Sequence, residues 1–140
     1  MMEVVRGGSV MYVLSVRQPW AWCLFHGKNV ENRTWPLPEH IQGLLVAIHA
    51  SSYKRWSWAE LTNDQWKTMP AEANLLELPH GAIIGIGRFT GCLTKETVGL
   101  WKDKGLYGFV WEPDKEFPKP IPCKGKLGFF IQTANLIGPW

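Results

Sequence analysis

Cysteine is scarce in this sequence. Its three cysteines, Cys23, Cys92 and Cys123, are odd in number and far apart, and no C-x-x-C or H-x-x-x-H spacing occurs. These cysteines therefore argue against a framework of disulfide bonds, and their number and spacing are typical of a protein in a reducing compartment. A structural zinc site is not expected either, because the four histidines are scattered along the chain. We expect no metal and no cofactor.

Long apolar runs are also missing. Lysine, arginine or proline interrupts every segment that could otherwise cross a bilayer, and the first ten residues contain Arg6 but no apolar stretch of signal-peptide length. We therefore expect a cytoplasmic protein. A chain of 140 residues fits a single domain. We assign residues 1–11 to a disordered tail and residues 12–140 to that domain.

The net charge is small, but the excess of basic residues is unevenly distributed along the chain. The formal net charge is +3; residues 1–58 hold six Lys or Arg against three acidic residues, and residues 59–140 hold nine against nine. The excess positive charge in the first part is weak evidence for an anionic partner. Nine tryptophans are present, most of them expected in the core, with some available to stack on a base.

The hydrophobic pattern predicts several strands interleaved with short helices. Strands are expected at residues 12–16, 30–35, 44–50, 82–89, 106–111 and 126–132, and a Pro- and Lys-rich loop joins the last two. Short helices are expected at residues 19–26, after a cap at Ser51 or Ser52, and after Thr62, where Gln65 completes a capping box. Gly85 and Gly87 share one strand face, which predicts close approach of another segment. The predicted fold class is α+β, a compact barrel with two or three flanking helices.

The densest group of polar side chains lies between Ser15 and Trp35. In the strand at 30–35, Glu31 and Arg33 point to the same face, and Lys28 follows the turn at Gly27. Two cations around one carboxylate favour the ionised form of Glu31. Two interpretations remain open from these residue types: a buried ion-pair network that is purely structural, or a ligand site.

Three motifs in this region carry a resemblance. They are R-Q-P-W at 17–20, G-K-x-x-E-x-R at 27–33 and I-H-A-S at 48–51, within the segments LSVRQPWAWCLFHGKNVENRTWP and LLVAIHAS. Together they closely resemble the ASCH (activating signal cointegrator homology) family over residues 12–52. Looser similarity continues in GAIIGIGRF and in the GFVWEP and KGKLGFFIQ segments. The resemblance implies a PUA-like β-barrel with a charged cleft, for which RNA binding is proposed in that family.

Carried over to this chain, the resemblance assigns eight residues to a cleft that binds RNA or a modified nucleotide: Arg17, Gln18, Trp20, Lys28, Glu31, Arg33, His49 and Ser51. Lys28 and Arg33 would hold phosphate. Glu31 and Gln18 would read polar edges, and a tryptophan would stack on a base. Trp20 itself has a competing use as a core residue, because it lies on a short helix.

Two other functions remain open. Some relatives are hydrolases of acetylated cytidine that use a lysine, a threonine three residues later and a glutamate; here Lys28 is present, but Glu31 occupies the threonine position. A metal-independent amidohydrolase or ribonuclease would therefore rely on Lys28, Glu31 and His49. The third possibility is a protein-interaction domain whose charged cluster is structural. The loop lysines Lys119, Lys124 and Lys126 could extend a positive surface, but we interpret them as part of a solvated loop.

Overall fold

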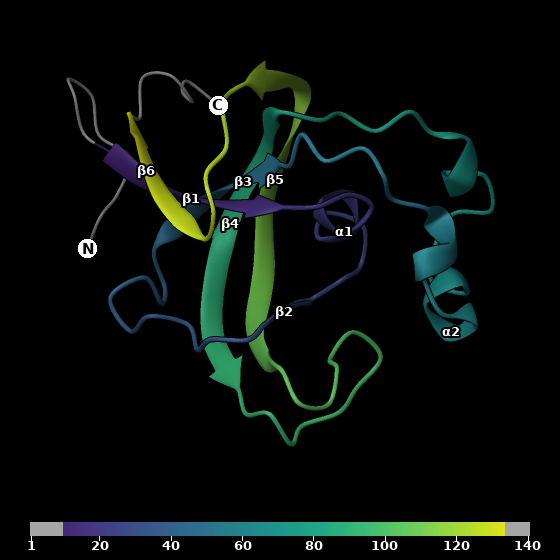
Figure 1. Ribbon diagram of the computed structural model, residues 1–140, viewed down its shortest axis with the longest axis horizontal. Helices are drawn as coiled ribbons and strands as arrows, with labels where there is room; N and C mark the ends of the chain where they lie inside the picture. Colours follow the sequence, from purple (N-terminus) through teal and green to yellow (C-terminus); the bar gives the residue numbers. More distant parts are fainter. Residues whose placement is uncertain (1–9, 134–140) are drawn as a thin grey trace.

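The computed structural model describes residues 10–133, which form one mixed β-sheet with a few short helices (Figure 1). The elements in chain order are β1 (Val10–Val16), α1 (Trp20–Cys23), β2 (Val30–Arg33), β3 (Leu45–Ala50), η1 (Trp58–Glu60), α2 (Asn63–Trp66), η2 (Ala73–Leu75), β4 (Ala82–Leu93), β5 (Tyr107–Pro122) and β6 (Phe129–Thr133). The predicted α+β class is confirmed.

The six strands are hydrogen-bonded in the order β2-β5-β4-β3-β1-β6. β1 and β3 are parallel, with Ser15 directly opposite His49, and the other neighbours are antiparallel. β4 and β5 are long and curved, and irregularities in their register interrupt the ladder at three places (Figure 1). The helix α1, at the end of β1, packs against one face of the sheet.

Gly85 and Gly87 permit the close packing that the sequence predicts on this strand. A Cβ at Gly85 would lie 2.6 Å from the ring of Phe25, and one at Gly87 would lie 2.5 Å from the ring of Trp111. Aromatic side chains therefore lie directly on the β4 backbone, in space that any other residue would fill.

The core consists of three apolar clusters. The largest packs α1 and the loop before β3 onto one face of the sheet, around Leu14, Ile48 and Phe109. A second, around Val13 and Ile86, covers the other face. The third lies beneath the helical segment that joins β3 to β4 and contains several indoles. No helix within residues 10–133 combines the length and the apolar character that a membrane span requires.

Several boundaries differ from the predicted ones. β1 begins at Val10, because Val10 and Met11 pair with β6 residues distant in sequence; the rest of the predicted tail lies outside the described residues. The helix expected after Ser51 or Ser52 does not form, and the first helical turn there is η1, capped by Ser57. The capping box of Thr62 with Gln65 is confirmed at α2.

The loop expected between Trp111 and Lys126 is largely strand. β5 continues to Pro122 through a segment that contains four prolines. β2 pairs with β5 only as far as Val110, so beyond that point β5 has a hydrogen-bonded neighbour, β4, on one side only. Proline is compatible with a strand there because its missing N–H can face the unpaired side.

Candidate functional site

The site is built on the turn between α1 and β2. The α1 helix ends in a turn in which the Lys28 N–H donates to the Cys23 carbonyl at 2.9 Å, and Gly27 adopts a φ of +107°. This is the left-handed conformation predicted for that glycine. The turn holds Lys28 against the end of α1, and Val30 at the start of β2 packs in one cluster with Trp22 and Cys23 of the helix.

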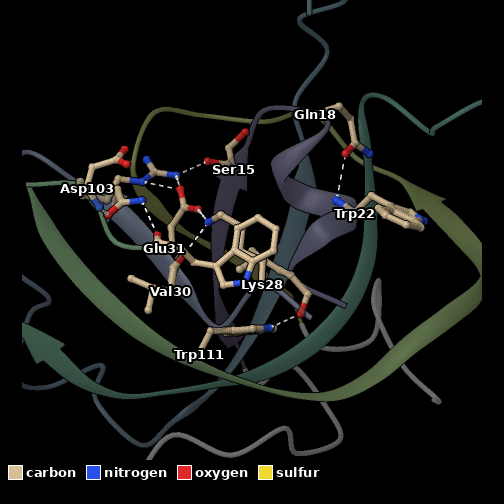
Figure 2. Close-up of polar contacts among 12 residues, drawn as sticks. Ser15, Gln18, Trp22, Lys28, Val30, Glu31, Asp103 and Trp111 are labelled. Atoms are coloured by element: carbon tan, nitrogen blue, oxygen red, sulfur yellow. Dashed lines mark hydrogen bonds and ion pairs between the residues drawn. The ribbon is translucent and has the colours of Figure 1, made fainter. Parts of the chain in front are cut away.

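Glu31 lies between two cations. Its Oε1 accepts from Lys28 Nζ at 2.9 Å, and its Oε2 accepts from Arg33 Nε at 3.1 Å and lies 3.0 Å from Arg33 Nη2. Figure 2 shows the Glu31 carboxylate in this bridging position. Burial would raise the pKa of Glu31, but the charges of Lys28 and Arg33 outweigh it and hold that pKa below its ordinary value. The structure thus confirms the predicted placement of two cations around this one carboxylate, which favours its ionised form.

Lys28 is buried, and two of its three ammonium N–H groups donate within the protein. Its side chain is 4% exposed, and its amine donates to the Val30 carbonyl as well as to Glu31. The expected phosphate contact from this lysine is therefore not available in this arrangement. A buried ammonium needs such partners because it has lost its water.

Arg33 differs from Lys28 because it reaches the surface. Its side chain is 19% exposed, and Nη2 donates to the Ser15 carbonyl at 2.9 Å while Nε faces Glu31. Among residues 10–133, no hydrogen bond engages its Nη1. The guanidinium is thus fixed on two sides and open on a third, the arrangement that suits recognition of an anion.

Two hollows border this group, and a third adjoins the first of them. The Arg33 hollow, of about 510 Å³, is lined by Arg17, Trp20, Glu31, Arg33, Trp35 and Lys126 among others. The Lys28 hollow, of about 280 Å³, includes Trp20, Lys28, Glu31, Glu60, Trp101 and Asp103. The His49 hollow, of about 590 Å³, includes Ser15, His49, Ser51, Cys123, Lys124 and Lys126.

The structure gathers four of the predicted residues besides Glu31 around the Arg33 hollow: Arg17, Trp20, Arg33 and Ser51. Arg17 is exposed, lies 4.5 Å from the centre of the Tyr53 ring, and has Nη2 3.4 Å from Glu60 Oε1. Trp20 is half-buried: it packs against two of the core clusters and also lines both the Arg33 and the Lys28 hollows. The expected core packing of this indole is confirmed, and part of the ring also lines the hollows.

Gln18 does not belong to the site. It is completely buried; its Oε1 accepts from the Trp22 N–H at 2.9 Å, and its Nε2 donates to the Pro79 carbonyl at 3.0 Å (Figure 2). The amide connects α1 to the segment before β4. The sequence could not show this, because Pro79 is distant along the chain.

His49 lies apart from the Lys28–Glu31 pair. Its Nδ1 lies 3.0 Å from Ser15 Oγ and its Nε2 lies 2.6 Å from the Cys123 carbonyl oxygen, which can only accept. The imidazole therefore donates from Nε2 and accepts at Nδ1. Burial lowers the pKa of His49, and the bond to Cys123 opposes that shift only in part. His49 lines neither the Lys28 nor the Arg33 hollow, so the three residues expected for hydrolysis are not brought together.

Several residues at these hollows were not foreseen as site residues. Lys126 lines the Arg33 hollow although its position in a Lys-rich loop indicated a solvated side chain. Glu60 and Asp103 line the Lys28 hollow. All three come from segments that are far from residues 15–35 in the sequence, and no local pattern indicates that these segments lie close together.

Within residues 10–133, His, Cys, Asp and Glu side chains form no group of three that could hold a metal ion.

The side chains that line the two neighbouring hollows carry opposite net charges. The Arg33 hollow has three cations, Arg17, Arg33 and Lys126, against the single carboxylate of Glu31. The Lys28 hollow has three carboxylates, including Glu31, against Lys28.

Compared with protein-family models and with curated proteins, the sequence matches none.

Proposed function

We propose that this chain binds RNA or a nucleotide, with phosphate in the Arg33 hollow. The observation that carries the proposal is the fixed guanidinium of Arg33, which Glu31 and the Ser15 carbonyl hold while one edge faces the hollow. The Nη1 edge, which no described residue engages, can donate to a phosphate oxygen from a guanidinium that is already oriented, at little entropic cost. Glu31 acts as a positioning residue.

The distribution of charge supports phosphate in this hollow and not in the neighbouring one. Arg17 and Lys126 are exposed cations at the same hollow as Arg33. In the Lys28 hollow, Glu60 and Asp103 add to the negative charge of Glu31 and oppose an anion. The same carboxylates suit hydrogen-bond donors such as the exocyclic amines of a base.

The indoles supply apolar surface for a base or a ribose. Trp20 lines both hollows, and Trp35 lines the Arg33 hollow with its ring 5.9 Å from the Arg33 guanidinium carbon. Base stacking on an indole contributes about 1–3 kcal/mol. A nucleotide with its phosphate at Arg33 and its base against Trp20 would use both the cationic and the acidic hollow.

The sequence resemblance also supports a proposal about the fold. We propose that the chain is an ASCH domain and that its sheet forms a PUA-like β-barrel. Contacts between the two ends of the sheet support a closed shape: the rings of Trp35, just after β2, and Phe129, in β6, lie 5.8 Å apart, and Arg33 donates to Ser15 in β1. Cytoplasmic location belongs to the same proposal.

Catalysis is the less favoured alternative. Both oxygens of Glu31 accept from cations, and its lowered pKa makes it a weak base. We therefore propose a binding module and not a hydrolase.

The test is binding of short single-stranded RNAs of mixed sequence as a function of salt. Arg17→Ala with Lys126→Ala removes two exposed cations from the Arg33 hollow. We expect weaker binding and a salt slope smaller by about 0.7 for each phosphate that the variant no longer neutralises. The matched control is Lys67→Ala, because Lys67 is an exposed lysine that lines none of the three hollows. Equal affinity of wild type and the double variant would reject this hollow as the binding site.

A further inference from the structure

We infer that the His49 hollow is a second phosphate subsite for the same ligand, so that the chain prefers an RNA strand of at least two nucleotides over a single nucleotide. This inference rests on the proposed function and names its ligand class more narrowly.

The two hollows adjoin each other. Ser15, Ser51, Lys126 and Leu127 line both of them. A ligand in the Arg33 hollow therefore has the His49 hollow directly beside it. Their volumes, about 510 and 590 Å³, each exceed the lower end of the range of about 300–1,000 Å³ found for small-molecule sites.

The charge of the His49 hollow suits a phosphate. Lys124 and Lys126 contribute two exposed cations, and its lining contains no Asp or Glu. Neither lysine forms an ion pair with any residue in 10–133, in contrast to Lys67, which lies 3.4 Å from Asp64. Unpaired cations around a concave surface attract an anionic ligand.

The loop that carries these lysines is held in place from beneath. The Cys123 N–H donates to the Gly81 carbonyl at 3.0 Å, and the Cys123 carbonyl accepts from His49. At Gly125 a Cβ would overlap the imidazole carbon Cε1 of His49, so the loop backbone rests directly on that ring. Lys124 and Lys126 therefore extend from a fixed backbone, which lowers the entropic cost of binding.

Leu127 marks the boundary between the two hollows. Its side chain is 99% exposed and lines both of them. A leucine in this position offers apolar surface to the ribose or base between two phosphates. The Ser15 and Ser51 hydroxyls lie on the same shared wall and can bond to sugar or phosphate oxygens.

Chain-length dependence of binding tests the inference. Unlabelled RNA strands of one, two, four and eight nucleotides, each with a 5′-phosphate, would compete with a fluorescent eight-nucleotide RNA, for wild type and for Lys124→Ala. Lys124 lines only the His49 hollow, so we expect its loss to weaken binding of strands of two or more nucleotides by about threefold to fivefold, the scale of one exposed cation–phosphate contact. Mononucleotide binding should not change. DNA strands of equal length separate recognition of the 2′-hydroxyl from recognition of phosphate alone.

Lys119→Ala is the control, because Lys119 is an exposed lysine of β5 outside all three hollows. Mononucleotides that bind as tightly as longer strands, or Lys124→Ala binding every length like wild type, would overturn the second subsite and leave the Arg33 hollow intact. Absence of binding at every length would overturn the proposed function as well.

Discussion

The Lys28 amine and the Glu31 carboxylate lie 2.9 Å apart, with side chains that are 4% and 9% exposed. A buried charge that loses its partner keeps the desolvation cost without the compensating attraction. Glu31 has two such partners, because Arg33 approaches its other oxygen. The pair is thus both a structural element and the support that orients Arg33 toward the hollow.

The first prediction concerns this pair. Glu31→Gln should lower the free energy of unfolding by about 3 kcal/mol or more, because it leaves the Lys28 ammonium buried beside a neutral amide. Urea unfolding at neutral pH measures the loss. Glu60→Gln is the matched control: it breaks the exposed pair with Arg17, whose contribution should be below about 1 kcal/mol. Similar small losses in both variants would show that the Lys28–Glu31 pair does not hold the fold.

The second prediction is the pH dependence that Glu31 confers. Its pKa in the folded protein lies below the ordinary value of 4.5, so near that pH the unfolded chain binds more protons than the folded one. The stabilisation is therefore complete above about pH 4.5 and is lost as the pH falls through the folded pKa. Unfolding of wild type and Glu31→Gln between pH 3 and 7 should show stabilities that converge on acidification. A constant difference across that range would contradict this linkage.

The third prediction concerns packing against β4. Gly87→Ala should destabilise the fold by about 2 kcal/mol or more, because the new Cβ would lie 2.5 Å from both the Glu112 carbonyl oxygen and the Trp111 ring. Gly91→Ala in the same strand is the control. A Cβ there meets nothing within 4 Å, and the substitution should be close to neutral. Thermal melts of both variants decide the question; equal melting temperatures would show that β4 can move away from these rings.

Much of the local structure could be predicted from the sequence. Continuous apolar runs located the strands that begin at Leu45 and at Ala82, and the Thr62 capping box was correct. The shared face of Glu31 and Arg33 followed from the two-residue period of a strand. The helix expected after Ser51 was wrong, because a serine that can cap a helix can equally begin an irregular segment.

The site itself could be predicted only in part. Arg17, Trp20 and Arg33 line one hollow, as expected. Gln18 does not, because it hydrogen-bonds to Pro79 far along the chain. Lys126 joins the hollow from a loop whose composition predicts solvated side chains.

The sequence by itself determined where most strands lie, the turn at Gly27 and the two cations beside Glu31. These depend on backbone preferences and on charges a few residues apart, which act within one turn or one strand. Only the tertiary structure decided that Lys28 is enclosed, that Arg33 stays open, and that the loop at Gly125 rests on His49. Those outcomes depend on how distant segments pack around a curved sheet, and no short stretch of sequence encodes that arrangement.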